Sequence, residues 1–388
     1  LTTNIDNVAV GFVAGRRITG ERNVALGSYA LDYGYVVNDS IAIGYQSAQY
    51  ATGSDNTFVG FQAGRGGTSS APYSSGQYNV ALGYKALTGF TTGNNNTAVG
   101  YQAADSVTTG DRNTIIGYDA GSSLTSGRLN TVLGTDAMNT MTIGERNVAI
   151  GNDALTAGVE DSYNVAIGYE ALHDQNAGGS DGVSTATHNT MVGYQAGDTI
   201  TTGKFNTGLG SGVAFDIDQS NQTAIGYGAT TDSVNDIAIG NTSVDEIKGQ
   251  VDFSTFSDRR IKKNIIDNDL GLDFINDLRP RKFNKVNPAE YPDEIKKKND
   301  GITGEWTDAQ ANKVWDGLIA QEVKEAVDKH KSSFSGWNVE KNSKENITYS
   351  TLTIPLIKAV QELTEKNERL QNKINDLEIF IMDKLGDE

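Results

Sequence analysis

Residues Asn96-Thr97-Ala98-Val99-Gly100 are one copy of a five-residue unit that recurs along the first 245 residues of the chain. The unit reads Asn, Val or Thr, Ala, an aliphatic residue and Gly, and it occurs 14 times, with the glycines at 11, 27, 44, 60, 83, 100, 117, 134, 151, 168, 193, 210, 226 and 240. The spacing is 16 or 17 residues, apart from two longer steps (60 to 83 and 168 to 193) and a final step of 14. A short, fixed period predicts a stacked array of repeats rather than a conventional globule.

Each position of the unit has its own chemistry. The residue before the glycine is Val, Ile or Leu in all 14 copies, and two positions earlier it is Val, Thr or Ile. These two share one face of a strand, because side chains alternate. The residue between them is Ala in 9 of 14 copies, which predicts a closely approached surface or axis on the other face. The glycine permits a bend or a positive φ, and the Thr, Gly, Asp and Asn that follow are typical of turns.

A short strand with a turn cannot bury itself, but stacked rungs can, and three chains wound together can do so better. We therefore expect a mainly β repeat rod over residues 1–245, a trimeric β-roll or β-helix of about 14 rungs. At about 4.8 Å per rung its length would be roughly 65–70 Å. The repeated Asn should form amide ladders along the stack. The array resembles the head repeats of trimeric adhesins and the repeats of phage fibre shafts.

Composition changes sharply near Ser257. Residues 1–256 contain 10 Lys and Arg against 24 Asp and Glu, a net charge of −14, whereas residues 257–388 contain 22 against 25, a net charge of −3; together these give −17. Of the 44 glycines, 38 precede Ser257, and all three tryptophans follow it. We expect a junction strand at 246–256, a small α+β domain at 257–350 and a C-terminal coiled-coil helix at 351–388.

Several classes of partner are disfavoured. The acidic balance argues against nucleic acid, and the chain lacks an apolar run long enough to insert into a membrane. No Cys is present, so disulfides and thiolate metal sites are excluded. We expect no metal and no cofactor, since the acidic turns match no calcium-binding pattern and His173 and His188 are isolated. The chain begins at Leu1 rather than Met, which predicts a piece of a longer protein.

The boundary stretch 256–265, Phe-Ser-Asp-Arg-Arg-Ile-Lys-Lys-Asn-Ile, carries the candidate chemistry. A Ser hydroxyl becomes a nucleophile when a nearby base takes its proton, and Lys is that base in Ser–Lys pairs. Ser257 is the candidate nucleophile, with Lys262 or Lys263 as the base. Lys263 would share a strand face with Ser257, whereas a Ser257–Lys262 pair needs a turn between them. The Asn264 amide could donate to an oxyanion.

Four segments, in order, resemble the intramolecular-chaperone autoprotease domain at the C-terminus of phage tail spikes and tail fibres, including endosialidases. The segments are SDRRIKKNI at 257–265, LRPRKFN at 278–284, GLIAQEV at 317–323, and ITYS at 347–350 followed by PLIKAV at 355–360. The resemblance covers roughly residues 254–375. It departs at Lys263, where Glu is commoner, and at 286–316, which is longer and more polar than usual.

The resemblance implies a chemical role for the boundary stretch. In that family the bond before the Ser is cleaved after the trimer assembles, which makes Phe256–Ser257 the scissile bond. Ser257 would be the nucleophile and Lys262 the general base of an N-to-O acyl shift, whose ester water then hydrolyses. Asn264, Gln321 and Glu322 are the candidates for oxyanion stabilisation or support of the dyad. The domain would cut its own chain once, with no turnover on external substrates.

A heptad register begins after Leu356, and its positions alternate intervals of three and four, as in coiled coils. Asn367 lies at an a position, where it would set the register. We expect a parallel trimeric coiled coil; the alternative is a helix packed only within its own chain. The expected trimerisation residues are Val360, Leu363, Asn367, Leu370, Ile374 and Leu377, with Ile381 continuing the register.

These inferences predict a phage tail fibre or spike for host attachment, matured by its own C-terminal autoprotease. Its partners would be two further copies and a host cell-surface glycan or protein receptor, in a virion assembled in the host cytoplasm. The insertions at 64–78 and 173–188 are candidate receptor loops or plain decoration. The alternatives are a glycan-depolymerising spike, which would need paired carboxylates in a cleft, and a bacterial trimeric surface adhesin, which would need an outer-membrane anchor.

Overall fold

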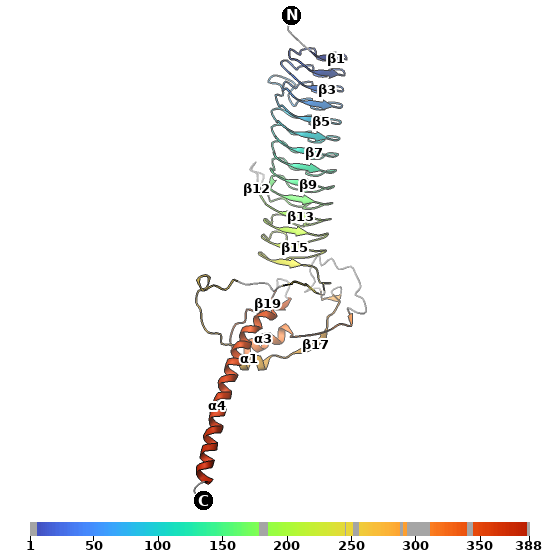
Figure 1. Ribbon diagram of the computed structural model, residues 1–388. Coiled ribbons are helices and arrows are strands. Elements are labelled where there is room, and N and C mark those ends of the chain that lie inside the picture. Colours follow the sequence, from blue (N-terminus) through green and yellow to red (C-terminus); the bar gives the residue numbers. More distant parts are fainter. Residues whose placement is uncertain are drawn as a thin grey trace. The chain divides into compact units, whose positions relative to one another are not determined.

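The computed structural model describes residues 6–177, 185–244, 246–250, 256–287, 290–292, 311–339 and 344–385. The chain forms two compact units. The first comprises Leu1–Val244, and the second comprises Asp245–Lys298 with Ile302–Glu388. The first unit is a β-solenoid in which each repeat makes one coil of the chain, with the strands on one side and the turns on the other (Figure 1). The predicted repeat rod is confirmed.

The strands of the solenoid are three residues long and pair in parallel, each with the strand of the next repeat and with the same repeat positions in register. Two shorter strands, β10 (Asp161–Ser162) and β12 (Thr185–Ala186), form a separate parallel pair. The 14 strands of the main sheet are β1 (Val8–Val10), β2 (Val24–Leu26), β3 (Ile41–Ile43), β4 (Thr57–Val59), β5 (Val80–Leu82), β6 (Thr97–Val99), β7 (Thr114–Ile116), β8 (Thr131–Leu133), β9 (Val148–Ile150), β11 (Val165–Ile167), β13 (Thr190–Val192), β14 (Thr207–Leu209), β15 (Thr223–Ile225) and β16 (Ile237–Ile239).

The core of the solenoid lies between the sheet and the turns. From β2 to β15 the middle residue of each strand is buried, as Ala98 is, while the residues on either side of it are partly or fully exposed. Large apolar side chains from the turns, including Leu87 and Leu124, fill the space opposite these small residues. The small middle residue therefore points inward, as its size predicts.

The repeat glycine is required by the closeness of the coils. Gly117 has a φ of +149°, and a Cβ at this position would lie 2.1 Å from the backbone oxygen of Gly134 in the next coil. No other residue could occupy this position without moving the neighbouring backbone. The glycine thus sets the distance between coils as well as the bend that ends each strand.

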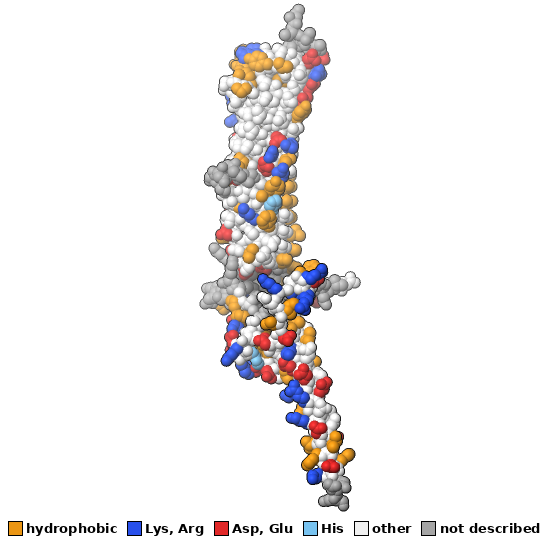
Figure 2. All heavy atoms as spheres, turned by 90° about the vertical axis from the view of Figure 1, so that its left-hand side faces the viewer, with side chains coloured by type: hydrophobic (Ala, Val, Ile, Leu, Met, Phe, Trp, Pro, Cys, Tyr) orange, Lys and Arg blue, Asp and Glu red, His pale blue; other side chains and the backbone are white. Residues whose placement is uncertain are grey.

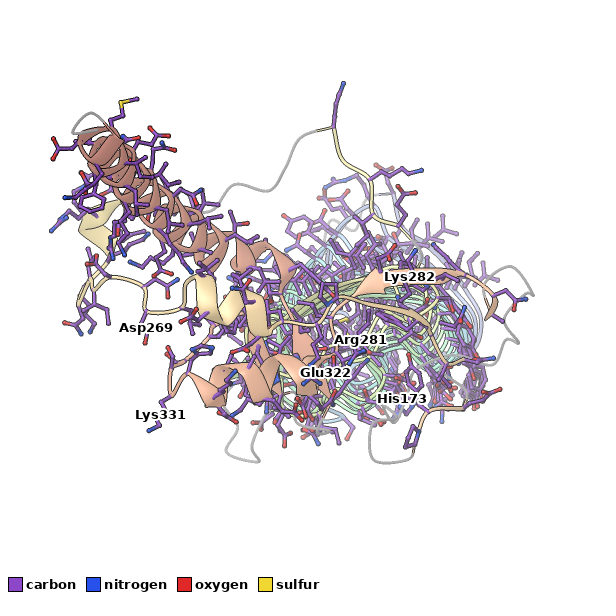
Figure 3. All side chains as sticks on the ribbon, turned by 90° about the horizontal axis from the view of Figure 1, so that it is seen from below. His173, Asp269, Arg281, Lys282, Glu322 and Lys331 are labelled. Carbon is purple, nitrogen blue, oxygen red and sulfur yellow. The ribbon has the colours of Figure 1, made fainter. Side chains whose placement is uncertain are left out.

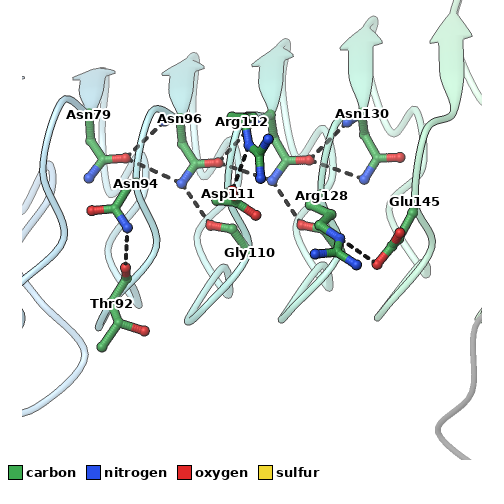
Figure 4. A network of polar contacts seen from close by, with 12 residues as sticks. Asn79, Thr92, Asn94, Asn96, Gly110, Asp111, Arg112, Arg128, Asn130 and Glu145 are labelled. Atoms are coloured by element: carbon green, nitrogen blue, oxygen red, sulfur yellow. Dashed lines mark hydrogen bonds and ion pairs between the residues drawn. The ribbon is translucent and has the colours of Figure 1, made fainter.

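The repeated asparagine forms the expected ladder inside the solenoid (Figure 4). The Oδ1 of Asn96 accepts hydrogen bonds from the backbone N and from the Nδ2 of Asn113, both at 3.0 Å. The Nδ2 of Asn113 also donates to the Gly127 carbonyl at 2.9 Å, and Asn130 repeats the pattern on Asn113. Each amide therefore satisfies a buried backbone donor of the next coil and a carbonyl of the turn after it.

The second unit is a small α/β region that ends in a long helix. Its elements are η1 (Arg259–Ile261), α1 (Leu272–Asp277), β17 (Arg281–Asn284), β18 (Val314–Gly317), α3 (Ala320–Lys329), β19 (Trp337–Val339), β20 (Glu345–Ile347), η3 (Tyr349–Leu352) and α4 (Thr353–Leu385). The strands form two antiparallel pairs, β17 with β18 and β19 with β20. The buried core joins α1 to α3 through Leu270, Phe274, Val323, Ala326 and Val327.

The junction differs from the expected strand at 246–256. Residues 246–250 and Phe256 form no strand, because no described strand lies beside them to share hydrogen bonds. Glu246 and Lys248 instead make an exposed ion pair at 2.8 Å. Residues 251–255 lie outside the described part of the chain.

The asparagine ladder generates a prediction about stability. Substitution Asn113→Ala removes the acceptor of the buried Asn130 backbone N–H and the donor to the Gly127 carbonyl. Leaving such groups buried without partners costs about 1–3 kcal/mol each, so we expect a clear loss in the free energy of unfolding, measured by denaturant titration. The matched control is Asn152→Ala, because Asn152 is exposed and its side chain, among the described residues, donates a hydrogen bond only to the neighbouring Asp153 side chain. Equal losses in the two variants would contradict a structural role for the ladder.

Candidate functional site

The structure brings Ser257 and Lys262 together at the start of the second unit. The Nζ of Lys262 donates a hydrogen bond to the Oγ of Ser257 at 2.6 Å. The turn that such a pair requires is present, because the 3₁₀-helix η1 lies between the two residues. Spacing left Lys262 and Lys263 as alternatives, and the structure places Lys262 on the hydroxyl.

The residues between them explain why the chain turns here. The carboxylate of Asp258 caps η1 by accepting a hydrogen bond from the Arg260 backbone N at 2.8 Å. The Arg260 side chain returns to the same carboxylate at 2.6 Å, and this hydrogen bond holds the pKa of Asp258 below its ordinary value. Lys262 closes the turn by donating its backbone N–H to the Arg259 carbonyl. Residues 258–260 therefore form a local turn, capped by the Asp258 side chain, which brings Ser257 and Lys262 together although they are five positions apart.

The Ser257–Lys262 pair is exposed to solvent in the single chain. Ser257 and Lys262 are both exposed, and Phe256, which precedes the candidate scissile bond, has 93% of its surface accessible. Ser–Lys chemistry requires an environment that favours a neutral amine and excludes competing water. The geometry of the dyad is thus built by local sequence, whereas the low-dielectric surroundings are not supplied by the described residues of one chain.

The other predicted site residues lie elsewhere or have a local structural role. Asn264 is exposed and has a φ of +54°, a left-handed conformation that Asn tolerates better than most residues. Gln321 is exposed in the first turn of α3. None of the hydrogen bonds found among the described residues joins Asn264, Gln321 or Glu322 to the Ser257 hydroxyl.

Glu322 forms a charged link between α3 and β17 that the sequence did not reveal. Its carboxylate accepts two hydrogen bonds from the Arg281 guanidinium, at 2.6 and 3.0 Å. Figure 3 labels both residues. The Arg279 guanidinium lies 3.9 Å from the same carboxylate. The Arg281 contacts hold the pKa of Glu322 below its ordinary value. Both arginines belong to the LRPRKFN segment and Glu322 to GLIAQEV, so two of the recognised segments meet through this fork. Their co-occurrence in order was the only sequence signal of the contact.

The expected trimerisation residues lie along one uninterrupted helix. α4 begins packing on the small domain, where Ala359 is buried and Glu362 accepts a hydrogen bond from the Leu272 backbone N at 2.7 Å. Beyond that point, residues 363–384 are all exposed. This exposed length includes Leu363, Asn367, Leu370, Ile374 and Leu377, and Val360 just before it is exposed as well.

Two further features of the described residues bear on the site. Among them, His, Asp and Glu side chains nowhere gather in a group of three or more that could hold a metal ion. Among the described helices, none has the length and apolar character needed to cross a membrane.

Comparison with known families identifies one domain, and its first residue is Ser257. Residues 257–331 match the Peptidase_S74 family model, the chaperone of endosialidase. The match begins at Ser257 and contains the first three recognised segments, while ITYS and PLIKAV lie beyond it. The chain matches no curated protein. A β-solenoid is therefore followed, at residues 257–331, by a region that matches the chaperone-of-endosialidase family, and this family implies self-cleavage.

Proposed function

We propose that this protein is a homotrimeric phage tail fibre or tail spike for host attachment, whose C-terminal domain directs trimeric folding and then cuts the Phe256–Ser257 bond. The observation that carries the proposal is the 2.6 Å contact between Ser257 Oγ and Lys262 Nζ at the first residue of the matched domain. The protein would act in the virion after assembly in the host cytoplasm, and a host cell-surface glycan or protein would be its receptor.

The proposed reaction needs only groups that the chain contains, together with water. The Oγ of Ser257 attacks the carbonyl carbon of Phe256 through a five-membered ring, while a neutral Lys262 amine takes the hydroxyl proton. The C–N bond then breaks, and the proton passes from Lys262 to the leaving amine of Ser257. The ester that joins the Phe256 acyl group to Ser257 Oγ is hydrolysed by water. The products are a Phe256 carboxylate and a C-terminal fragment with Ser257 as its free N-terminus.

Coupling of this reaction to assembly would follow from the exposure of the dyad. In the single chain, both the Ser257 hydroxyl and the Lys262 amine are exposed to solvent. A surface that covers them would exclude water from the hydroxyl and favour the neutral form of the amine. Neighbouring copies of the chain are the proposed cover. Cleavage would then report completed assembly, as it does in the family that this domain resembles.

Two apolar surfaces support association with further copies. The first is the exposed heptad face of α4, because a continuous apolar stripe on a helix is rarely left exposed to water. The second is the outer face of the solenoid sheet, where residues such as Val80, Leu82 and Leu209 are exposed. An aromatic ladder runs through the coils of this unit, with Tyr84, Tyr101 and Tyr118 stacked at 5.0 and 4.9 Å between ring centroids.

The number of chains is a separate inference. Val360, Ile374 and Ile381 at a positions with leucines at d are a combination that suits two-stranded coiled coils in isolated peptides. We propose three chains because the protein resembles trimeric fibre proteins. In such proteins the whole assembly, and not the coiled coil alone, determines the number of chains. Measurement of the mass of the intact assembly therefore tests the proposal directly.

The dyad generates the first functional prediction. Refolded wild-type chain should release a fragment of 132 residues that begins at Ser257, about 14 kDa of the 41.4 kDa chain. Ser257→Ala should remain whole, because the attacking oxygen is gone. Lys262→Met should slow cleavage by about 10²–10⁴-fold, as expected for loss of a general base. Intact mass and N-terminal sequencing follow the products.

Lys263→Met is the matched control for this experiment, because it removes the neighbouring amine that has no contact with the hydroxyl. It should cleave at the wild-type rate. Cleavage that persists in Ser257→Ala, or that is lost in Lys263→Met and kept in Lys262→Met, would reject the proposed dyad. Hydroxylamine should accelerate release in the wild type, since it attacks esters and leaves amides intact at neutral pH.

The helix generates a second prediction. Cleavage-deficient Ser257→Ala should have a light-scattering mass of three chains, about 124 kDa from three times 41.4 kDa. Adding Leu370→Asp places a charge at a d position and should abolish the trimer, because the carboxylate would be buried without a partner. Asn372→Asp adds the same charge two residues away on the f face and should leave the mass unchanged. A dimeric mass, or a trimer that tolerates Leu370→Asp, would contradict the proposed role of α4.

A further inference from the structure

The first three coils of the solenoid break the repeat pattern at one position. The sixth residue after the repeat glycine is Arg17, Tyr33 and Tyr50 in these coils. In the next nine coils the same position holds only Gly, Ser, Thr, Ala or Asp, from Gly66 to Asp216. Small residues therefore suffice for the fold at this position, and the large side chains near the N-terminal end need another explanation.

The tyrosines at this position form one platform with two others. Tyr33 and Tyr50 pack at 5.2 Å between ring centroids, and Tyr73 joins them at 5.1 Å from Tyr33 and 6.2 Å from Tyr50. Tyr35 stacks on Tyr73 at 6.1 Å and is 42% exposed, while the other three rings are half-buried. Four aromatic rings with polar hydroxyl groups thus lie together at the surface of the turns.

Arginines lie against this platform. The guanidinium of Arg17 lies 4.1 Å from the centre of the Tyr33 ring and donates to the Tyr35 hydroxyl at 3.2 Å. Arg65 lies 5.2 Å from the centre of the Tyr50 ring, and its buried Nε has no hydrogen-bond partner among the described residues. Hydrophobic and basic side chains lie together near the N-terminal end of the solenoid, above a surface that is mostly neutral and polar (Figure 2).

Neither arginine forms an ion pair among the described residues. The nearby carboxylates are already paired, Asp32 with Arg16 at 2.9 Å and Asp39 with Arg22 at 2.6 Å. Within the described part of the chain, no carboxylate lies within ion-pair distance of Arg17 or Arg65. Residues 1–256 carry a net charge of −14 with only 10 basic residues, so two guanidinium groups that lie on packed tyrosine rings without an ion-pair partner depart from the rest of the unit.

The loop that carries Tyr73 is held in place by the coils. Ser74, the next residue, exchanges backbone hydrogen bonds with the neighbouring coil, donating to the Tyr50 carbonyl at 3.0 Å and accepting from Thr52 N at 2.7 Å. Its hydroxyl is buried and donates to the Phe90 carbonyl at 2.7 Å. The insertion at 64–78 therefore delivers Tyr73 to the platform from a fixed backbone, which limits the entropy lost when a ligand binds.

We propose that this tyrosine–arginine cluster (Tyr33, Tyr35, Tyr50, Tyr73, Arg17 and Arg65) is a binding site for a carboxylate-bearing saccharide. The flat tyrosine rings offer apolar faces to the C–H faces of pyranose rings, and their hydroxyls can exchange hydrogen bonds with sugar hydroxyls. Each of the two guanidinium groups supplies a fork of donors that suits a sugar carboxylate. An acidic glycan satisfies all three kinds of group together.

A saccharide fits the cluster better than an acidic peptide does. Peptide recognition commonly adds a strand to a sheet edge or inserts a helix into an apolar groove. The cluster lies on the turns, where the coils already hydrogen-bond one another, as Tyr33 N does to the Gln49 carbonyl at 3.0 Å. It presents ring faces and polar tips rather than unpaired backbone, which is the chemistry of a sugar site.

This inference rests on the attachment role proposed above and gives that role a location and a ligand class. It is independent of self-cleavage and of the number of chains. If the cluster fails to bind sugar, the fragment that begins at Ser257 and the mass of the assembly can still be observed. If the proposed maturation fails, saccharide binding can still be measured on the solenoid within the full chain.

The test is direct binding of the full chain to a panel of soluble oligosaccharides that contain glucuronic, galacturonic or sialic acid, each beside its methyl ester. We expect at least one acidic member to bind, with its ester about tenfold weaker or more, because the ester removes the charge that Arg17 and Arg65 pair with. Arg17→Gln and Arg65→Gln should each weaken binding about tenfold or more. The double substitution Tyr33→Ser with Tyr50→Ser should abolish it.

The serine substitutions use a residue that other coils carry at this position, Ser106 and Ser123, so the solenoid should fold as before. Arg112→Gln is the matched arginine control, since Arg112 is exposed and pairs with Asp111 at 2.7 Å on another coil. It should bind as the wild type does.

Four outcomes of the binding experiment would overturn the proposal. They are no binding of any acidic member, equal binding of acid and ester, binding that survives the cluster substitutions, and cluster-dependent binding of an acidic probe peptide such as polyglutamate but of no saccharide. A change in the light-scattering mass of the tyrosine variant would also overturn it, by showing that the cluster is a contact between chains.

Discussion

Each coil of the solenoid depends on the next coil for its hydrogen bonds. The backbone N of Thr97 donates to the Asn113 carbonyl, and the backbone N of Gly117 donates to the Val99 carbonyl, so donors and acceptors alternate between neighbours. Asn113 adds a side-chain bond in each direction, donating from Nδ2 to Asn96 Oδ1 and accepting at Oδ1 from Asn130 N, and Gly117 lets the backbones approach closely enough for these bonds to form. A single coil could not satisfy its own backbone or bury its small middle residue. Stability therefore belongs to the stack and falls away at its ends, as in other repeat proteins.

The same dependence explains why a separate folding domain is useful. Every strand pair of the main sheet joins residues at least 14 positions apart in sequence, and parallel pairings of this kind form slowly while exposing strand edges. The second unit is built differently, with a small core around Phe274 and a continuous helix that leaves its apolar face open. An assembly that begins at this helix would hold neighbouring solenoids in register while they form. Removal of the helix afterwards would leave a product that cannot readily refold once it has unfolded. The stability of that product would therefore be kinetic, set by its rate of unfolding.

Much of the solenoid could be predicted from sequence, because the same residue types recur at the same positions of each repeat. The small residue at Ala98 predicted the inward face, and the repeated Asn predicted the buried ladder; the structure confirms both. The sequence shows where the repeat pattern is broken, but it does not show which of those residues lie together in the fold. Tyr73 lies in an insertion with no period, and only the folded backbone brings it to Tyr33 and Tyr50.

The candidate site was predictable in part. The requirement for a turn between Ser257 and Lys262 followed from spacing, but the choice of that lysine depends on the Asp258–Arg260 cap, which closes the turn in three dimensions. Glu322 was expected to support the dyad, and its contacts run instead to Arg281 on β17, since a carboxylate beside a guanidinium fork takes the stronger partner. The expected junction strand failed over 246–250, where alternation was weak and no neighbouring strand was available.

We propose that the Ser257–Lys262 dyad is assembled within one chain and becomes reactive only when neighbouring chains cover it. The most direct test is to refold the chain over a wide range of protein concentrations and to follow cleavage and assembled mass in the same samples. If neighbouring chains supply the cover, cleavage should lag behind assembly and slow steeply on dilution. Cleavage at a constant rate under dilution that keeps the chain monomeric would contradict it.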